Sequence, residues 1–600
     1  MTAIQTFTGL RPAAKQIILN YARRRGITSD GINEFLQPAL RLERGSLPQA
    51  DQFISRLTAA VKNQERILIF GDYDADGITA TTILLQCLRK TAGVTPMWAL
   101  PNRQVDDYGL DLDKAKSLHA QHRPTLLVCL DCGTNSAEAI GWLKQQGVDT
   151  LVVDHHPLES AIPDAIALAN PKAHGRDTDD CCAAGLALLL CHKLASVWKA
   201  EAKWDRDSAV ILAGIGTVAD AVSMTPLNRA IVKCAINLMS DRRKVAAIPG
   251  LAALLANAGA VNQRQLQFDT IPKLNAVGRL GNAEPAVTLL TTTDLVTAKS
   301  IATHCCERNE IRKQLQRQMV SQAKTLAGVV VGDHPETPVL VLAESSWHHG
   351  VAGPAASLIA ELYQRSVILL APHGEQQWKG SGRSANGDHL GRWIRDMKHV
   401  GLVERGGGHA RAVGLAATHA QLAPLQSAGL FLPMPQTDHE SEQEVIGDIG
   451  ELQPEEWSSV IALLAPYGRS NPFPIISVQA AMCQSEPTAL IGNDNGQPWA
   501  VKAQFKTESG LRFTAIWRNA GTAMKQWRTG AHYDLVLELT AQKKGERTFH
   551  NWSVVACHHQ EGKDKSHPEG LTATGSFQPP PRRANFQKRE DVKTCRYFGR

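Results

Sequence analysis

The 600-residue sequence lacks the features that mark secreted and membrane proteins. Its start, MTAIQTFTGLRPAAK, has no basic stretch followed by an apolar one, so no secretory signal is expected. The closest approach to a membrane-spanning run, residues 245–261, is interrupted by proline, glycine and asparagine. The 12 cysteines are scattered and include the adjacent pairs Cys181/Cys182 and Cys305/Cys306, which do not fit an ordinary disulfide framework. We therefore expect a cytoplasmic protein with free thiols and no contact with a membrane.

The sequence also lacks a large excess of either charge sign. The net charge is +6, aromatic residues make up 5% of the chain and charged residues 20%. This balance allows a polyanionic partner without requiring one. The length corresponds to about four domains, and the composition is that of a globular protein.

Alternation of apolar strands with loops and helices predicts an α/β multidomain fold. Arg66–Phe70, Thr125–Leu130 and Asp149–Val153 are apolar runs, and each is followed by a polar cluster and a helical stretch. Such βαβ units form a parallel sheet, whose ligands bind at the carboxyl ends of the strands. A fourth apolar element, Ala209–Val218, precedes Asp220.

The rest of the chain divides by composition. A helix from Asp294 to about residue 326 would be about 50 Å long, a second α/β unit begins at 338–343, and period-2 runs at 512–517 and 533–540 predict a small β-barrel. We expect an N-terminal helical segment (1–48, with short helices at YARRRGI and INEFLQP), a catalytic domain (49–290), a connecting helix (291–330), an α/β domain (331–433), the barrel (434–562) and a disordered basic tail (563–600).

Three carboxylates follow the first predicted strand, in the segment GDYDADG. Asp72, Asp74 and Asp76 are spaced two residues apart, and like charges so close together raise one another's pKa unless a cation lies among them. Turn and capping chemistry would need only one of them. An EF-hand loop is excluded, because position 12, counted from Asp72, is Ile83 rather than glutamate.

The same chemistry recurs after the next strands. LDCGTN places Asp131 after the second strand, and Asp154, His155 and His156 follow the third. A single aspartate in this position is often a helix cap and a single histidine is usually a core residue, but three successive strands deliver such groups to one sheet edge. Carboxylates with imidazole and no organised thiolates favour Mn²⁺ or Mg²⁺ over a structural zinc.

The pair Cys129 and Cys132 has the CxxC spacing of zinc and redox motifs. A zinc site would need a second such pair, and a thioredoxin-type motif opens a helix, whereas Cys129 lies within a predicted strand. Core packing is the better interpretation.

These motifs, in this order, resemble the DHH phosphoesterases. GDYDADG (71–77), LDCGTN (130–135), DHH (154–156) and GTVADAV around Asp220 match the four motifs of that superfamily, and GSGRS (380–384) and GGGHARAVG (406–414) resemble its DHHA1 domain. LAPYGRSNP (464–472) is a further match. The order, with an OB-like barrel after the DHHA1 domain, resembles the bacterial exonucleases specific for single-stranded DNA, from about residue 15 to 560.

The resemblance implies a phosphodiesterase with two metal ions and no ATP. Its metal ligands would be Asp72, Asp74, Asp76, Asp131, His155 and Asp220. His156 would face the scissile phosphate, Asp154 would orient the histidine pair, and Asp131 or Asp220 would bridge the metals; His156, Asp154 and Asp131 are the expected catalytic residues. Paired metals activate water and stabilise the leaving oxygen, so no side-chain nucleophile is needed.

The resemblance also implies a second set of residues that binds DNA. Arg103, Ser381 and Arg383 resemble the pocket for the 5′-phosphate, since arginine forks match phosphate oxygens. Arg279 lies in a segment that resembles the rim of the active site. His409 follows three glycines that admit a close phosphate, and Trp347 belongs to a segment that faces the DNA path in the family. Phe513 and Trp517 in the barrel are candidates either for base stacking or for core packing.

The expected function is metal-dependent 5′→3′ exonuclease activity on single-stranded DNA, releasing 5′-mononucleotides in recombination and repair. The alternatives are a DHH–DHHA1 phosphodiesterase for oligoribonucleotides or small nucleotides, whose relatives are shorter and lack the barrel, and a non-catalytic nucleic-acid-binding scaffold. The sequence contains no P-loop, so a separate helicase would have to expose the strand in duplex DNA. A single-strand-binding protein is a further expected partner, and the chain is expected to be a monomer.

Overall fold

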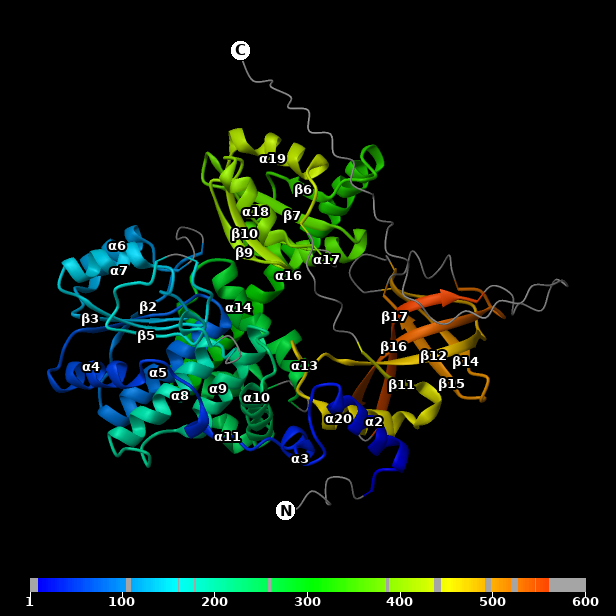
Figure 1. Cartoon of the computed structure of the whole chain (residues 1–600), viewed down its shortest axis with the longest axis horizontal. Coiled ribbons are helices and arrows are strands. Elements are labelled where there is room, and N and C mark those ends of the chain that lie inside the picture. Colours follow the sequence, from blue (N-terminus) through cyan, green and yellow to red (C-terminus); the bar gives the residue numbers. More distant parts are fainter. Residues whose placement is uncertain are drawn as a thin grey trace, which may run out of the picture. The chain divides into compact units, whose positions relative to one another are not determined.

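The computed structural model describes residues 9–103, 109–159, 161–176, 180–256, 261–384, 388–435, 444–491, 498–518, 527–544 and 547–560 (Figure 1). The expected tail at 563–600 lies outside these residues. Among the described residues, we find no helix with the length and apolar character that crossing a membrane requires.

The N-terminal segment is helical and begins with α2 (Pro12–Arg23), α3 (Ile32–Leu36) and the 3₁₀ turn η1 (Leu42–Arg44). The helix predicted over YARRRGI is only the end of α2, which stops at Arg23 because Gly26 takes a positive φ of 70° three residues later. Helix α4 (Ala50–Lys62) follows and buries Phe53 and Leu57.

A five-stranded parallel sheet forms the first α/β domain, as predicted. The strand order is β2-β1-β3-β4-β5. The strands are β1 (Ile67–Phe70), β2 (Met97–Ala99), β3 (Leu126–Leu130), β4 (Asp149–Val153) and β5 (Ala167–Ala169). The short edge strands β2 and β5 are the two that the apolar runs did not predict.

Helices cover both faces of this sheet, because alternate strand residues face opposite ways. Ile69 and Val128 face a core built with α5 (Ala75–Ala92), α8 (Ala183–Val197) and α9 (Arg206–Ala219). Leu68 and Leu127 face the core under α6 (Leu112–His122) and α7 (Ala137–Gln145) (Figure 1). The fourth apolar element, 209–218, lies in the buried helix α9.

Shorter helices complete the domain and lead to a long one. They are η2 (Lys172–His174), α10 (Pro226–Met239), α11 (Arg242–Ala246), α12 (Pro249–Leu254), α13 (Gln263–Gln265), the π-helical turn η3 (Leu266–Thr270), α14 (Ile271–Arg279) and α15 (Glu284–Thr291). Helix α16 (Leu295–Asp333) begins where predicted, with Asp294 as its cap, but continues past Gly328 to 39 residues, or about 58 Å.

The second α/β domain is a mixed five-stranded sheet of order β6-β7-β8-β10-β9. Strands β6 (Val339–Ala343) and β7 (Ser366–His373) are parallel, and β8 (Gln377–Arg383), β10 (Ala412–Thr418) and β9 (Arg405–His409) continue antiparallel. Helix α17 (Ala352–Tyr363) packs with α16 against one face, while α18 (Leu390–His399) and α19 (His419–Phe431) cover the other. The 3₁₀ turn η4 (His349–Val351) precedes α17.

A closed β-barrel follows, as predicted. Strands β12, β16, β17, β15 and β14 pair in that order, and a β12–β14 pairing closes the ring of five. The elements are β11 (Glu444–Asp448), η5 (Ile449–Glu451), α20 (Pro454–Leu464), β12 (Pro474–Cys483), β13 (Thr488–Ile491), β14 (Pro498–Lys506), β15 (Arg512–Trp517), β16 (His532–Lys544) and β17 (Arg547–His559). Phe513 is buried and stacks on Phe505 with ring centroids 5.8 Å apart, so core packing is its correct interpretation.

Candidate metal centre

The loop after β1 holds three aspartates in a tight turn. Gly77 allows this turn, since a Cβ atom there would lie 2.6 Å from the backbone N of Asp72. The Asp72 side chain is buried, and Oδ1 of Asp74 caps α5 by accepting the N–H groups of Asp76 (2.9 Å) and Gly77 (3.2 Å). Asp74 is therefore a helix cap whose second carboxylate oxygen is left for another partner.

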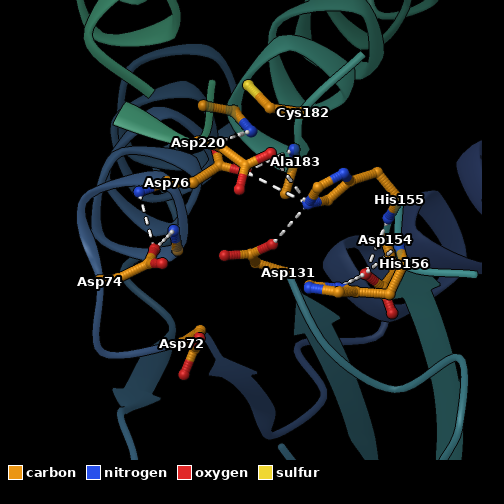
Figure 2. Close-up of polar contacts among 12 residues, drawn as sticks. Asp72, Asp74, Asp76, Asp131, Asp154, His155, His156, Cys182, Ala183 and Asp220 are labelled. Carbon is orange, nitrogen blue, oxygen red and sulfur yellow. Dashed lines mark hydrogen bonds and ion pairs between the residues drawn. The ribbon is translucent and has the colours of Figure 1, made fainter. Parts of the chain in front are cut away.

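Asp76 is held by a helix that the sequence analysis did not connect with the site. Its Oδ2 and Oδ1 accept the N–H groups of Ala183 (2.8 Å) and Ala184 (2.9 Å), at the N-terminus of α8 (Figure 2). Backbone N–H groups at the start of a helix favour a negative charge. Backbone N–H groups carry these two hydrogen bonds, so the segment around Cys182 gave no sequence signal for them.

Asp131 follows the last residue of β3 in a left-handed conformation, with φ of 65°. The side chain is 2% exposed, and Oδ1 has no hydrogen-bond partner among the described residues. A non-glycine residue in this region of backbone space is strained by about 1–2 kcal/mol. The strain places the carboxylate among those of the loop after β1, where Figure 2 shows it beside Asp76 and His155.

Asp154 organises the two histidines that follow β4. Its Oδ1 accepts the N–H of His155 (2.7 Å) and Nδ1–H of His156 (2.7 Å), and Oδ2 accepts the N–H of Thr134 (3.0 Å). Burial would raise the pKa of Asp154, but the charge of His156 and these hydrogen bonds hold it well below the ordinary value. Burial lowers and Asp154 raises the pKa of His156, to a net value of about 9, so this imidazole is charged at neutral pH.

Asn170 supports this arrangement and was also missed. Its buried Nδ2 donates to Oγ1 of Thr134 and to the carbonyl of His156, both at 2.8 Å. The amide thereby ties the segment after β5 to the two turns that carry Asp131 and His156. In a sequence, an Asn-Pro pair after a short strand indicates a turn. No sequence feature distinguishes a turn residue from one that also ties neighbouring segments together.

His155 points into a group of carboxylates without a hydrogen-bond partner on either ring nitrogen. Its Nε2 lies 3.3 Å from Oδ1 of Asp131, 3.6 Å from Oδ2 of Asp220 and 3.8 Å from Oδ2 of Asp76 (Figure 2). Burial and the charge of His156 lower its pKa to about 3, so the ring is neutral. Asp220 reaches the group as the C-terminal cap of α9.

Burial and mutual repulsion raise the pKa of four of these carboxyl groups. Burial, with the charge of Asp74, raises the pKa of Asp72 to about 8 and that of Asp76 to about 6. Burial and Asp76 raise the pKa of Asp131 and Asp220 well above the ordinary value. A cation would reverse these shifts.

The donor atoms fit two such cations. Three sets have ligand atoms within 4.8 Å of one another: Asp76, His155 and Asp220; Asp72, Asp74 and Asp131; and Asp131, His155 and His156. Carboxylate oxygens and a neutral imidazole without thiolates suit Mn²⁺ or Mg²⁺. Cys129 and Cys132 are both buried in the sheet core and contribute no ligand to these sets, which agrees with their interpretation as packing residues.

Three arginines predicted to bind phosphate converge beside this centre. The guanidinium of Arg103 lies over the ring of Tyr73 at 5.0 Å, Nη1 of Arg279 donates to the carbonyl of Gly350 at 3.4 Å, and a Cβ at Gly353 would lie 2.9 Å from Nη2 of Arg383. Burial, followed by the charge of Arg103, lowers the pKa of both Arg279 and Arg383.

Ser381 and His409 belong to the same side of the second sheet. Ser381 lies on β8, two residues before Arg383, and is partly exposed. His409 is the last residue of β9 and is exposed. It lies opposite Ala412 of β10, and Ala412 lies opposite Arg383 of β8. The sequence therefore brings Arg103, Arg279, Ser381, Arg383 and His409 from two domains toward one region.

Trp347 does not fit the DNA-facing position expected for it. The side chain is 6% exposed, packs in the core between α16 and α17, and its Nε1–H donates to Oε1 of Gln322 on α16 at 2.8 Å. The tryptophan is a core residue with its polar atom satisfied. In the barrel, Trp517 is partly exposed with its ring 5.6 Å from that of Trp527, so base stacking and packing both stay open for it.

Comparison with known proteins identifies the two α/β domains. Residues 66–215 match the model of the DHH family, N-terminal domain, and residues 336–428 match the DHHA1 domain. The single-stranded-DNA-specific exonuclease RecJ of Escherichia coli (strain K12) is 30% identical over 479 residues, 75% of this chain and 82% of that protein. The RecJ protein of Haemophilus influenzae is 29% identical over 440 residues, 71% of this chain and 76% of that protein.

Solved structures show the same fold. The crystal structure of RecJ in complex with Mn²⁺ from Thermus thermophilus superposes with a TM-score of 0.73 at 24% identity, covering 95% of this chain and 79% of that one. A crystal structure of exonuclease RecJ bound to manganese has a TM-score of 0.55 at 29% identity, covering 65% of this chain and 95% of that one. This chain therefore belongs to the RecJ family of DHH–DHHA1 proteins.

Proposed function

We propose that this chain is a Mn²⁺- or Mg²⁺-dependent exonuclease that hydrolyses single-stranded DNA from the 5′ end, releasing 5′-mononucleotides in recombination and repair. Its relatives at 30% identity are exonucleases specific for single-stranded DNA. The observation that carries the proposal is the buried, unpartnered imidazole of His155 among the carboxylates of Asp76, Asp131 and Asp220.

The candidate metal ligands divide into two sets that meet at Asp131. One metal would be held by Asp76, His155 and Asp220 and the other by Asp72 and Asp74, with Asp131 shared between them. Bound metals would lower the pKa of a water and stabilise negative charge on the phosphoryl group. This chain supplies the ligand atoms and buries the side chains of Asp72, Asp76, Asp131 and His155.

His156 is the candidate residue for the scissile phosphate. Its positive charge, held by Asp154, favours an anionic oxygen within reach of Nε2–H. Asp154 acts through His156 and is therefore a positioning residue. The amide of Asn170 fixes the backbone carbonyl of His156 and contributes to the same orientation.

Direction of digestion would follow from the phosphate-binding residues. Arg103, Arg279 and Arg383, with Ser381, offer guanidinium forks for a terminal 5′-phosphate beside the carboxylates. A strand anchored there presents its first phosphodiester to the metals, so cleavage releases one nucleotide at a time. His409 and the backbone of β9 would bind a neighbouring phosphate.

Neither alternative function is favoured. A scaffold would not need the complete donor set around His155, and none of its candidate members is missing. Relatives matched over two thirds or more of both chains are named exonucleases for single-stranded DNA, not small-nucleotide phosphodiesterases.

The proposed function also implies protein partners and a cellular compartment. A single-strand-binding protein would present the substrate and a helicase would expose it from duplex DNA, because the sequence has no P-loop. We propose a cytoplasmic monomer; the cysteines of the described residues are free thiols, as a reducing compartment maintains.

End-labelled strands test the function. With Mn²⁺, single strands carrying a 5′-phosphate should lose a 5′ label as mononucleotide while a 3′ label stays on shortening intermediates. Asp76→Ala should abolish both. Arg383→Ala should remove the preference for 5′-phosphate over 5′-hydroxyl ends, whereas Arg395→Ala, on the exposed side of α18, should keep it. Loss of the 3′ label first, or equal products from Asp76→Ala, would contradict the proposal.

A further inference from the structure

A cavity of about 490 Å³ lies between the N-terminal segment and helix α10, and we call it the α10 cavity. The N-terminal segment lines it with residues between 34 and 46, and Cys181 and the start of α10 complete the wall. The volume is in the ordinary range for sites that bind small molecules. None of the candidate metal ligands and none of the residues proposed to bind DNA lines this cavity, so a ligand here would occupy a separate site.

Two arginines give the α10 cavity a positive wall. Arg41 and Arg44 are three residues apart at the 3₁₀ turn η1, and residues at this spacing lie on the same side of such a turn. Among the described residues, neither guanidinium has a hydrogen bond or an ion pair. Ser46, which also lines the cavity, accepts a hydrogen bond from Nη1 of Arg176. A third arginine is thus held beside the cavity, and guanidinium groups match the oxygens of a phosphate.

The remaining lining residues suit a nucleoside. Ala39, Leu227 and Ala230 give the cavity an apolar surface against which a base can pack. The acid in the lining is Glu34, whose Oε1 accepts the N–H of Ala39 at 3.2 Å. Its Oε2 accepts no hydrogen bond from the described residues, so it can accept one from an amino or hydroxyl group of a ligand. A phosphate joined to an apolar ring that carries such groups is the chemistry of a nucleoside 5′-monophosphate.

The turn that carries the arginines is fixed against the catalytic domain. Gly45 follows Arg44 and packs on α8, where a Cβ at this position would lie 2.4 Å from Cδ2 of Leu189. Leu42, inside the turn, is buried in the same core as Leu189. This wall is therefore preformed, and little ordering of the protein would oppose the binding of a ligand.

The wall that contains Cys181 leads directly to a candidate metal ligand. Cys181 lies two residues before Ala183, and the N–H groups of Ala183 and Ala184 donate to the carboxylate of Asp76. A shift of the backbone at Cys181 would therefore move the donors that hold Asp76 in place.

Helix α10 is tied to the same segment by a buried amide. Asn228 follows Leu227 of the cavity wall, and its Nδ2 donates to the carbonyls of Asp180 and Ser223. The N–H of Ser223 in turn donates to Oδ2 of Asp180 at 2.9 Å. These bonds join α10 to the segment that begins at Asp180 and contains the donors to the metal ligand. A compound that fills the cavity would stabilise the conformation in which this segment holds that ligand.

We propose that the α10 cavity binds a nucleoside 5′-monophosphate, with the phosphate on Arg41 and Arg44, and that its occupancy strengthens metal binding at the candidate metal centre. Mononucleotides are also the product of the proposed exonuclease, so this site would let the enzyme respond to the product that accumulates around it. That regulatory role rests on the proposed function, whereas binding of the mononucleotide does not.

Calorimetric titration of dAMP in EDTA tests the binding site. The double variant Arg41→Glu/Arg44→Glu should weaken dAMP binding by at least about 10-fold, because two charged hydrogen-bonding groups are lost. Ala39→Trp, at an exposed position of the lining, should block binding by filling the cavity. Arg243→Glu, whose side chain is 93% exposed on α11, is the matched control and should keep the wild-type affinity. Loss of binding in Arg383→Ala but not in the double variant would overturn the assignment.

Competition and cross-linking define the ligand. Deoxyadenosine and inorganic phosphate should each displace bound dAMP at least about 10-fold less well than dAMP itself, because each lacks one half of the contacts. The photoreactive analogue 8-azido-dAMP should label peptides from residues 34–46 or 225–230. Equal displacement by inorganic phosphate, or labelling confined to peptides outside these two ranges, would overturn the nucleotide site.

Titration of free Mn²⁺ by electron paramagnetic resonance tests the coupling. Saturating dAMP should tighten Mn²⁺ binding to the wild-type chain by at least about 5-fold, and this gain should be absent in Ala39→Trp. Equal affinities with and without dAMP, or an equal gain in both proteins, would overturn the coupling. If the wild-type chain digests no DNA but dAMP binding still depends on Arg41 and Arg44, the exonuclease proposal fails and the nucleotide site stands.

Discussion

Nε2 of His155 lies 3.3 Å from Oδ1 of Asp131, and neither atom has a hydrogen-bond partner among the described residues. Buried polar atoms are rarely left unpaired in folded proteins. With the imidazole neutral, a cation bound by a ring nitrogen and by the Asp131 carboxylate would satisfy both atoms. We therefore expect a cation to bind between these two side chains.

Metal binding should release protons. The pKa of Asp72 is about 8, while the unfolded value is about 3.9, so the metal-free chain retains at pH 7 a carboxyl proton that the ion must displace; Asp76, with a pKa of about 6, is mostly ionised there. Affinity for Mn²⁺ should therefore rise with pH. Calorimetric titration at pH 7 in two buffers of different ionisation enthalpy should give different heats, corresponding to at least about one released proton.

The same shifts determine how the metal-free chain responds to pH. Between about pH 4 and 8 the unfolded chain has lost the Asp72 proton and the folded chain has kept it, so stability falls as pH rises through this window. The stabilisation conferred by Mn²⁺ in thermal melts should be larger at pH 8 than at pH 6. Equal heats in the two buffers, with an equal gain in melting temperature at both pH values, would show that the carboxyl groups are already ionised.

Two glycines of α9 offer a matched pair of substitutions. A Cβ at Gly216 would lie 2.7 Å from Oδ1 of Asp76, whereas a Cβ at Gly214 would lie 2.2 Å from Cβ of Ala235, away from the site. Gly216→Ala should displace Asp76 and weaken Mn²⁺ binding by about 10- to 100-fold. Gly214→Ala should lower the melting temperature without changing the affinity of the folded chain. Titration of free Mn²⁺ by electron paramagnetic resonance measures both, and equal affinities would contradict the placement of Asp76.

Removing the charge of Asp154 should move the basic limb of the pH profile. His156 is charged below about pH 9 because of Asp154, so activity that needs the imidazolium falls as pH rises through that value. In Asp154→Asn the pKa of His156 should fall toward about 6.5, with a loss of about 30-fold in kcat at pH 8 from the smaller imidazolium fraction. Asp149→Asn, at the other end of β4 and paired with Arg56, is the control and should keep the wild-type profile. A profile of Asp154→Asn with an unmoved basic limb would contradict the role of His156.

Arg229 should be a determinant of stability rather than of activity. Its guanidinium lies 4.0 Å from the ring centroid of Phe35, and it donates to the carbonyls of Phe35 (2.8 Å) and Pro466 (2.9 Å). Arg229→Ala removes the buried guanidinium and its hydrogen bonds to these carbonyls, of which that of Pro466 keeps only the bond from Nδ2 of Asn471, so we expect a loss of about 3 kcal/mol in the free energy of unfolding. Arg243→Ala, with a side chain 93% exposed, should change it by less than about 0.5 kcal/mol. Urea unfolding followed by circular dichroism compares the two, and similar midpoints would contradict the assignment.

The sheet and most of the candidate centre were predictable because their residues carry the information themselves. The runs of β1, β3 and β4 are apolar on both faces, and their carboxyl ends had to meet, which brought Asp76, Asp131 and His155 together. The N-terminus of α8 was not predictable, since it holds Asp76 with backbone N–H groups that any residue has. Trp347 was expected on the DNA path because its segment resembles one that faces DNA in the family, but the indole is buried with its N–H bonded to Gln322, and the resemblance of the segment does not determine where one side chain packs.

The left-handed backbone conformation of Asp131 means that the residue type best for folding differs from the one that the proposed activity requires. Glycine would relieve the strain there, and asparagine tolerates that conformation better than most residues. A library selected only for soluble expression should therefore enrich glycine or asparagine at residue 131, while selection for digestion of DNA should retain aspartate. Lineages released from the need to cut DNA would be expected to drift first at this residue.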